Sequence, residues 1–314
     1  MARVSNFTAV ETEDADRIDL ALRSTVCNQR IDADSVVVAN GNRRFVLNSI
    51  QLNDGRKIRF LHHECENEAA PTIVFVHGFP LDHSMWQGQL PLAQQATLIM
   101  PDLSGFGQSG PCAEDVTMKS FADDIAELLD QLGVSKAVFC GLSMGGYIGW
   151  EFVKHHGEKL AGLICCNTRA AADDETTARA RRVAAAQVLK TGAGPVAVAM
   201  KEKLFAAGTL SGNPNLVAAI SKVIENTDPR SIAAAQLAMS QRSNFLNALD
   251  QIELPTLVIG GEHDSITVSN EMQEMSMLIG ESTFVEIADA GHLSPAEQPA
   301  VFNNAVTHWL DRVS

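Results

Sequence analysis

Apolar and polar positions follow two rhythms along most of the chain. Short apolar runs are typical of strands buried on both faces of a parallel sheet, and they occur at residues 71–76, 96–100, 136–139, 160–166, 255–260 and 282–287. Longer segments between them have helical spacing. In residues 117–131, Phe121, Ile125 and Leu128 fall on one face, and Gly133 follows as a stop. The alternation predicts an α/β fold with a mostly parallel, doubly wound sheet and right-handed crossovers.

Two parts of the chain depart from this rhythm. Residues 49–52 and 57–61 alternate around Asn53-Asp54-Gly55, which predicts an antiparallel hairpin. Residues 170–248 are rich in alanine, contain several Gly and Pro breaks and lack any strand pattern. We therefore expect a helical cap over residues 170–248, inserted into a core formed by residues 47–169 and 249–314.

The first 46 residues have weak periodicity and an acidic beginning. Apolar positions between residues 16 and 30 are compatible with one face of a short helix. We interpret residues 1–46 as an N-terminal extension that is poorly ordered or peripheral to the core.

Composition excludes some partners. The chain has 314 residues and a formal net charge of −14, and nucleic acids and anionic membrane surfaces attract basic patches, so neither is expected as a partner. No apolar run approaches the roughly 20 residues that span a bilayer. The six cysteines do not form a disulfide framework, and the acidic N-terminus lacks a secretory signal. A cytoplasmic protein is predicted, and the oligomeric state is left open.

Residues 141–145, Gly-Leu-Ser-Met-Gly, stand between an apolar strand and a helix-like segment. In that context the Gly-x-Ser-x-Gly pattern indicates a nucleophile elbow. Gly141 and Gly145 allow the close backbone approach that the sharp turn requires. The turn would expose Ser143 at the carboxyl end of the strand, beside a helix N-terminus that favours developing negative charge.

Residues 49–314 resemble the serine hydrolases of the α/β-hydrolase fold. The resemblance rests on motifs that follow strands in a fixed order, namely His77-Gly78-Phe79-Pro80, residues 102–109, the elbow at Ser143, Gly-Glu-His-Asp ending at Asp264, and Ala-Gly-His ending at His292. It implies an α/β-hydrolase fold with an inserted helical cap.

The resemblance also implies a catalytic triad. It makes Ser143 the nucleophile, Asp264 the acid and His292 the base, because a serine hydroxyl needs an imidazole to take its proton and a carboxylate to orient that imidazole. The backbone amides of Phe79 and Met144 would form the oxyanion hole.

Other side chains compete for these roles. Asp102 lies in a glycine-rich loop before the nucleophile, and we interpret it as an acceptor for backbone amides. Asp289 shares a short loop with His292 and is poorly placed to reach behind the ring. Asp82 and His83 follow the His-Gly loop and are expected at the entrance of the pocket.

The identity of the nucleophile narrows the reaction. Haloalkane dehalogenases and epoxide hydrolases of this fold carry Asp where this chain has Ser143, so acyl chemistry remains. The elbow and the junction at residues 166–170 are similar to those of small carboxylesterases, in particular the 3-oxoadipate enol-lactonase group. This implies a serine hydrolase that cleaves a small ester or lactone through an acyl-enzyme at Ser143. The alternatives are a small-ligand receptor or signalling protein with slow turnover, and a cofactor-free perhydrolase or haloperoxidase.

No cofactor is expected, and no metal. The run His62-His63-Glu64-Cys65-Glu66 contains ligand types, but neighbouring residues of a strand point to opposite faces and do not converge on one ion. An apolar acyl pocket is predicted from Trp86, Phe205, Met239 and Leu293. Arg169 is a candidate for recognising an acidic substrate group, with a structural ion pair as the alternative.

Overall fold

The computed structural model describes residues 36–40 and 43–313, so the helical face predicted within residues 16–30, and most of the predicted N-terminal extension, lie outside the described residues. The strands are β1 (Val36–Asn40), β2 (Arg43–Gln51), β3 (Lys57–His63), β4 (Thr72–Val76), β5 (Thr97–Pro101), β6 (Ala137–Leu142), β7 (Leu160–Cys166), β8 (Thr256–Gly261) and β9 (Ser282–Ile287). The α-helices are α2 (Met118–Gln131), α3 (Met144–His156), α4 (Glu175–Thr191), α5 (Gly194–Leu204), α6 (Ala207–Gly212), α7 (Pro214–Asn226), α8 (Pro229–Ser240), α9 (Ser269–Met277), α10 (Ser294–Glu297) and α11 (Pro299–Val313). The 3₁₀ helices are η1 (His83–Gln94), η2 (Gly157–Lys159) and η3 (Leu246–Gln251).

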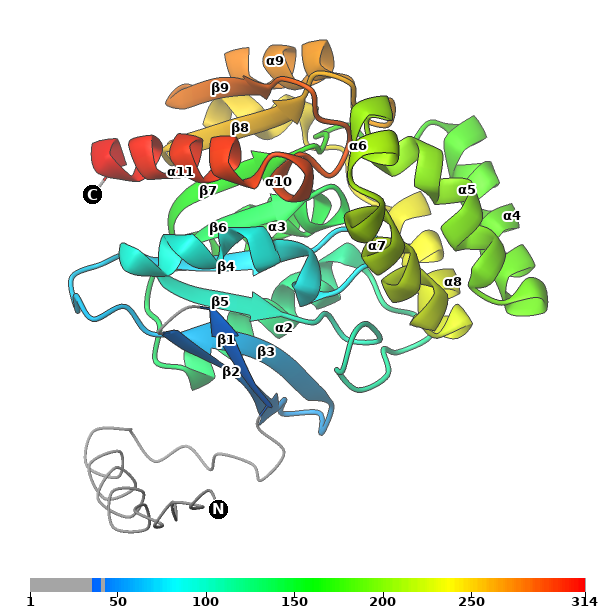
Figure 1. The fold of residues 1–314 in the computed structure, drawn as a ribbon, viewed down its shortest axis with the longest axis horizontal. Helices are drawn as coiled ribbons and strands as arrows, with labels where there is room; N and C mark the ends of the chain where they lie inside the picture. Colours follow the sequence, from blue (N-terminus) through cyan, green and yellow to red (C-terminus); the bar gives the residue numbers. More distant parts are fainter. Residues whose placement is uncertain (1–35, 41–42, 314) are drawn as a thin grey trace, which may run out of the picture. The chain divides into compact units, whose positions relative to one another are not determined.

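All described strands belong to one nine-stranded sheet in the order β1-β2-β3-β5-β4-β6-β7-β8-β9 (Figure 1). The first three strands and the β3–β5 pair are antiparallel, and every pair from β5 to β9 is parallel. The predicted α/β-hydrolase sheet is therefore confirmed. The predicted hairpin is also present, with Gly55 at φ 89° in the turn between β2 and β3.

The sheet begins earlier than predicted. β1 and the first residues of β2 lie within the span that we had assigned to a peripheral extension. Phe45 and Leu47 are buried against the other strands of the sheet, with 1% and 3% exposed. The boundary at residue 46 is therefore wrong, because β1, which contains the valine run 36–38, pairs with β2 as a further antiparallel strand of the sheet.

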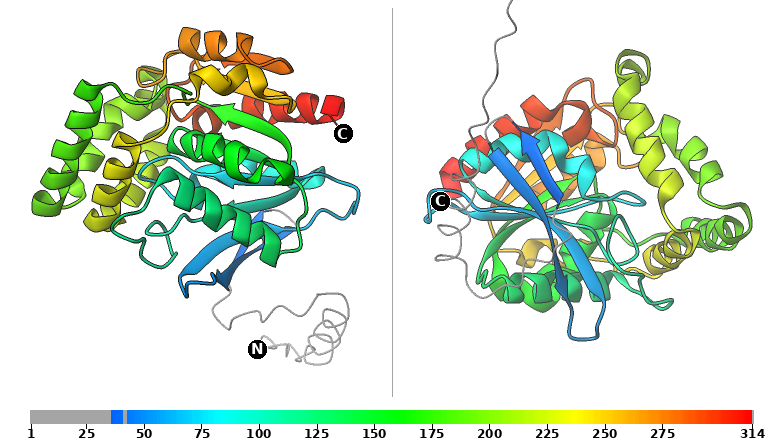
Figure 2. Two further views of the ribbon diagram at one scale, coloured as in Figure 1. Left: turned by 180° about the vertical axis from the view of Figure 1, so that it is seen from behind. Right: turned by 60° about the horizontal axis from the view of Figure 1, so that its bottom comes forward.

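Helices cover both faces of the sheet (Figure 2). The apolar residues of α2, α3 and α9 join a core on one face with sheet residues such as Val74 and Phe139. The residues of η1 and α11 join a second core on the other face with Phe75 and Cys140. Alternate residues of each central strand thus enter different cores, which explains why these strands are apolar throughout. Among the described residues, no helix has the length and apolar character needed to cross a membrane.

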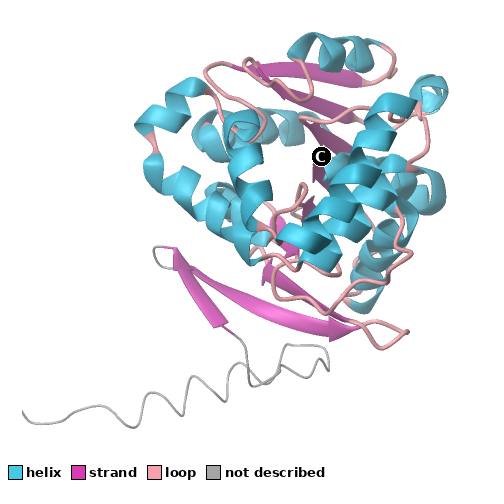
Figure 3. Ribbon diagram, turned by 90° about the vertical axis from the view of Figure 1, so that its right-hand side faces the viewer, coloured by secondary structure: helices cyan, strands magenta, loops and turns pink. Residues whose placement is uncertain are grey.

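The span between β7 and β8 contains five α-helices, α4 to α8, followed by η3, and no strand. We call α4–α8 the cap. Seen from its side, the cap lies in front of the ends of the strands (Figure 3). Its contacts with the core run to loops that follow strands: the Thr227 hydroxyl donates to the Pro80 carbonyl at 3.3 Å, and the Leu293 amide donates to the Leu204 carbonyl at 3.1 Å. The cap therefore adjoins the carboxyl edge of the sheet.

Candidate active site

Ser143 occupies the turn between β6 and α3 in a strained backbone conformation. Its φ is 53° and its ψ is −111°, outside the regions that a non-glycine residue ordinarily adopts. Its amide donates to the Cys166 carbonyl at 2.9 Å, and its carbonyl accepts the Thr168 hydroxyl at 2.8 Å. The end of β7 and the residues after it therefore bind both the amide and the carbonyl of Ser143.

The loop that follows β4 packs directly on this turn. A Cβ on Gly145 would collide with the Val76 carbonyl oxygen, so the first turn of α3 lies against the end of β4. A Cβ on Gly78 would lie 2.7 Å from Leu142 Cδ2 and 3.4 Å from Ser143 Cβ. Only glycine permits these approaches. Phe79, the next residue of the loop, is consequently held beside Ser143.

The two amides predicted to form an oxyanion hole belong to this arrangement. Phe79 follows Gly78, and Met144 is the first residue of α3. Within residues 43–313, neither amide donates a hydrogen bond to a protein acceptor. Both amides therefore remain available to a ligand oxygen.

His292 and Asp264 are paired on neighbouring loops at the same edge of the sheet. His292 follows β9, Asp264 follows β8, and His292 Nδ1 lies 2.8 Å from Asp264 Oδ2. The two residues are 2% and 4% exposed. Burial alone would raise the pKa of Asp264, but the positive charge and hydrogen bond of His292, with further hydrogen bonds from Thr267 and Asn167, lower it to about 2.

Sequence reasoning missed the residues that hold Asp264. Its Oδ2 accepts from the Thr267 hydroxyl at 2.5 Å and from Asn167 Nδ2 at 2.8 Å. Its Oδ1 accepts from the amides of Ile266 at 2.7 Å and Thr267 at 3.0 Å. The Ser294 hydroxyl donates to Asn167 Oδ1 at 2.5 Å, which fixes the amide so that its nitrogen faces the carboxylate. Asn167 has a φ of 43° at the end of β7, and an Asn directly after a strand was the available signal because Asn tolerates that conformation.

Comparison with known proteins agrees with this geometry. A family model described as the alpha/beta hydrolase fold matches residues 71–299. The chain belongs to the α/β-hydrolase fold family. It is 30% identical over 243 residues to 3-oxoadipate enol-lactonase 2 of Acinetobacter baylyi, covering 77% of this chain and 89% of that protein.

Solved structures of other proteins also resemble this chain. A thermophilic esterase from Thermogutta terrifontis superposes with a TM-score of 0.81 at 36% identity, covering 90% of this chain and 99% of that one. The enol-lactonase from Burkholderia xenovorans superposes with a TM-score of 0.77 at 27% identity, covering 84% and 99% respectively.

The two rival acids of this α/β hydrolase lie in other surroundings. Asp102 is completely buried and accepts from the amides of His83 and Gln108, each at 2.8 Å, and from His83 Nδ1 at 2.7 Å. The prediction that Asp102 serves backbone amides is confirmed. Asp289 is exposed, and its own amide donates to Glu262 Oε2 at 3.0 Å.

The four residues predicted to form an apolar acyl pocket lie in different surroundings. Trp86 is completely buried between the rings of Phe75 and Phe302, with centroids 5.1 Å and 6.2 Å away. This packing makes Trp86 a core residue of η1 and corrects its interpretation as a pocket residue. Phe205, Met239 and Leu293 are also buried, at 4%, 2% and 0% exposed. Phe205 lies between α5 and α6, and Leu293 directly follows His292.

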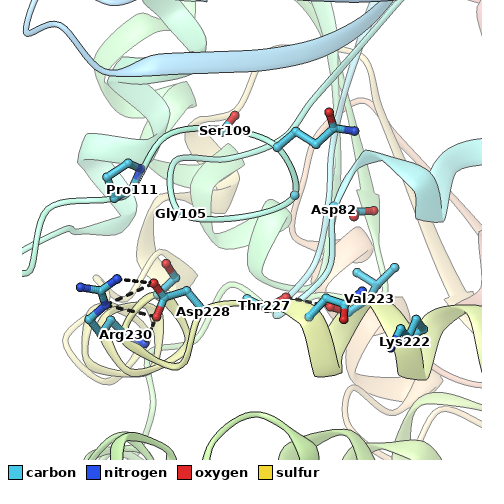
Figure 4. A pocket seen from close by; sticks show the side chains of 13 residues that line it. Asp82, Gly105, Ser109, Pro111, Lys222, Val223, Thr227, Asp228 and Arg230 are labelled. Carbon is cyan, nitrogen blue, oxygen red and sulfur yellow. Dashed lines mark hydrogen bonds and ion pairs between the residues drawn. The ribbon is translucent and has the colours of Figure 1, made fainter. Parts of the chain in front are cut away.

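A cavity of about 580 Å³ lies between part of the cap and two loops of the core (Figure 4). Asp82 and the loop from Gly105 to Pro111 form its core side, and Lys222, Thr227 and Arg230 lie on the cap side. Its lining is largely polar and includes neither the three triad candidates nor the four predicted pocket residues. Of the two residues expected at a pocket entrance, Asp82 lines this cavity, whereas His83 is hydrogen-bonded to Asp102.

Arg169 is engaged in structural contacts. Its Nη2 lies 3.2 Å from Glu271 Oε2 and also donates to the Ile266 carbonyl. The ion-pair alternative for Arg169 is the one that the structure contains. These contacts tie the end of β7 to the loop that carries Asp264.

Proposed function

We propose that this α/β hydrolase is a serine hydrolase that cleaves a small ester or lactone through an acyl-enzyme at Ser143. The observation that carries the proposal is the His292–Asp264 hydrogen bond of 2.8 Å, at the sheet edge where Ser143 occupies a strained elbow. The names of the relatives, an enol-lactonase and an esterase, support the same substrate class.

In the proposed mechanism, Ser143 Oγ attacks the carbonyl carbon while His292 Nε2 takes its proton. Asp264 binds Nδ1–H, keeps the proton on that nitrogen and leaves Nε2 free to accept. The imidazolium then returns the proton to the departing oxygen, and the carbon–oxygen bond of the ester or lactone breaks. A water molecule, deprotonated by the same imidazole, hydrolyses the acyl-enzyme and restores Ser143.

The amides of Phe79 and Met144 would stabilise the oxyanion of each tetrahedral intermediate. The contact of the Gly78 position with Ser143 supports this role, since it holds the Phe79 amide near the nucleophile. Removing one such donor typically costs roughly 3 kcal/mol of transition-state stabilisation. The α3 N-terminus adds a favourable partial positive charge at the same point.

The test is turnover of a panel of short-chain p-nitrophenyl esters and small lactones by the parent protein and by Ser143→Ala. We expect the variant to lose a factor on the order of 10⁶ in kcat because the covalent step becomes impossible. Ser211→Ala is the matched control, since Ser211 is an exposed cap serine whose hydroxyl bonds only to backbone carbonyls of its own helix.

Circular dichroism verifies that each variant is folded. A Ser143→Ala protein within tenfold of the parent would end the proposal. Binding of an ester analogue without turnover of any panel member would favour a small-ligand receptor instead.

A further inference from the structure

The loop that carries His292 is bonded directly to the cap. The Leu293 amide donates to the Leu204 carbonyl at 3.1 Å. On the other side of His292, a Cβ on Gly291 would lie 2.6 Å from the Ala206 nitrogen and 2.8 Å from the Phe205 carbonyl carbon. The backbone between α5 and α6 is therefore packed against the residues on both sides of the imidazole.

One carboxylate closes this contact. Glu297, the last residue of α10, accepts from the Gly291 amide at Oε1 and from the Ala206 amide at Oε2, each at 2.8 Å. The Thr209 side chain of α6 also interacts with this carboxylate and favours its charged form. Glu297 is half-buried, and α6 and α10 are neighbours in Figure 1. A single side chain thus joins the His292 loop to the cap.

Two backbone donors on one carboxylate make the connection specific. Hydrogen bonds to a charged acceptor are stronger than those between neutral groups. Each amide would otherwise be unpaired in a partly buried position, so both segments lose stabilisation if either moves away. The cap cannot shift at residues 204–206 without pulling on Gly291, and hence on the backbone of His292.

We propose that Glu297 is a positioning residue that couples the cap to the imidazole of His292. By holding the amides of Gly291 and Ala206 together, it fixes the loop of the proposed base in the position set by the cap. Phe205 lies between Leu204 and Ala206, so a substrate that displaced Phe205 would also displace the loop of His292. The kinetic part of this inference rests on the proposed hydrolase function.

Glu297→Gln tests the coupling with little change in size. The amide keeps one acceptor oxygen and presents an NH₂ group to the other backbone N–H, so one of the two bonds is lost. We expect hydrogen exchange at the Gly291 and Ala206 amides to accelerate about ten- to a hundredfold, the range for loss of one hydrogen bond to a charged group. We also expect kcat on a butyrate ester to fall at least about fivefold while KM changes less than about twofold, because the variant loosens the base and leaves the nucleophile in place.

Glu262→Gln is the matched control. Glu262 accepts from the Asp289 amide at 3.0 Å, so it bonds to the same loop, but it is exposed and forms no hydrogen bond or ion pair with the cap among the described residues. Its variant should change neither the exchange of Ala206 nor the ratio of kcat on butyrate to kcat on acetate. Thr209→Val, which removes only the interaction of the Thr209 hydroxyl with Glu297, provides a milder variant and should produce smaller changes in the same direction.

Hydrogen exchange is measured without substrate, so it tests the connection between the cap and the His292 loop whether or not the protein hydrolyses an ester. If the parent protein hydrolysed no ester, that result would count against the proposed function alone. Unchanged exchange at both amides in Glu297→Gln would overturn the proposal. So would faster exchange with unchanged kcat and an unchanged butyrate-to-acetate ratio in an active parent background, because Glu297 would then stabilise the loop without positioning the base.

Discussion

Replacing Asp264 by asparagine should lower both the turnover and the stability of the protein, and the two losses can be measured separately. Oδ2 of Asp264 receives the Thr267 hydroxyl, Asn167 Nδ2 and His292 Nδ1 at 2.5, 2.8 and 2.8 Å. In Asp264→Asn the two backbone amides retain the carbonyl oxygen, and the new NH₂ group faces these three donors. The Thr267 hydroxyl can rotate to accept, and His292 can accept at Nδ1 only by moving its proton to Nε2.

The losses of stability and of turnover should differ in size. The pKa of Asp264 lies near 2 instead of the ordinary 3.8, a difference that favours the folded, charged form by about 2 kcal/mol. Because the folded-state pKa is the lower one, this stabilisation is present above the unfolded value and is lost as the pH falls towards 2. Loss of the correct tautomer costs roughly 10⁴ in turnover in comparable triads, or about 5.5 kcal/mol. The kinetic loss should therefore exceed the part of the stability that depends on the charge of Asp264.

The assay compares kcat on a short-chain ester with the free energy of unfolding in urea, both at neutral pH. Asp102→Asn is the matched control, because Asp102 is equally buried, binds a histidine at 2.7 Å and accepts backbone amides at 2.8 Å. It should lose comparable stability and keep kcat within about tenfold. If Asp102→Asn abolished turnover in a folded protein while Asp264→Asn retained it, the assignment of the acid would be wrong.

Two further predictions concern residues outside the proposed triad. Burial lowers the pKa of His83, but its hydrogen bond and charge interaction with Asp102 outweigh burial and raise the pKa. The ion pair therefore stabilises the folded protein below the ordinary pKa of about 6.5, and this stabilisation is lost as the pH rises through the folded-state pKa. The unfolding free energy lost in His83→Gln should accordingly be larger near pH 5.5 than near pH 9, and equal losses at both would contradict this sign. Trp86→Phe should lower stability by about 1–2 kcal/mol, since it shrinks a buried side chain between Phe75 and Phe302, and leave ester chain-length preference unchanged. A changed preference would restore Trp86 to the substrate pocket.

Local signals in the sequence were sufficient for most regular elements. The predicted helix over residues 117–131 is α2, where Thr117 and Ser120 form a reciprocal capping box. Gly133, predicted as its stop, has a φ of 71°. Each signal acts within a few residues, so one sequence contains it completely. β1 was missed because its valine run is short and lies beside a segment without periodicity.

The parts of the site that were missed depend on contacts that are distant in sequence. Asn167 and Asp264 are separated by 97 positions, and Asn167 and Ser294 by 127. Glu297 belongs to no local pattern that distinguishes it from an ordinary surface residue, and the position of Asn167 directly after a strand does not reveal its distant partners. Trp86 illustrates the opposite error: apolar character near the site cannot separate core packing from a pocket wall, because both require the same residue types.

The order of the strands explains why the loop of the proposed base needs so many attachments. Ser143 follows β6 and His292 follows β9, three strand spacings or roughly 14 Å away in a sheet. The loop after β9 must therefore cross the ends of β8 and β7 to approach the elbow. After β8, the His263 amide donates to the Ala290 carbonyl at 2.8 Å. After β7, Asn167 Nδ2 lies 3.3 Å from the Gly291 carbonyl. Gly261 makes the crossing possible, because a Cβ there would collide with the Gly291 carbonyl oxygen. Without these bonds a loop spanning that distance would sample many positions, and only a fraction of molecules would present the imidazole to Ser143.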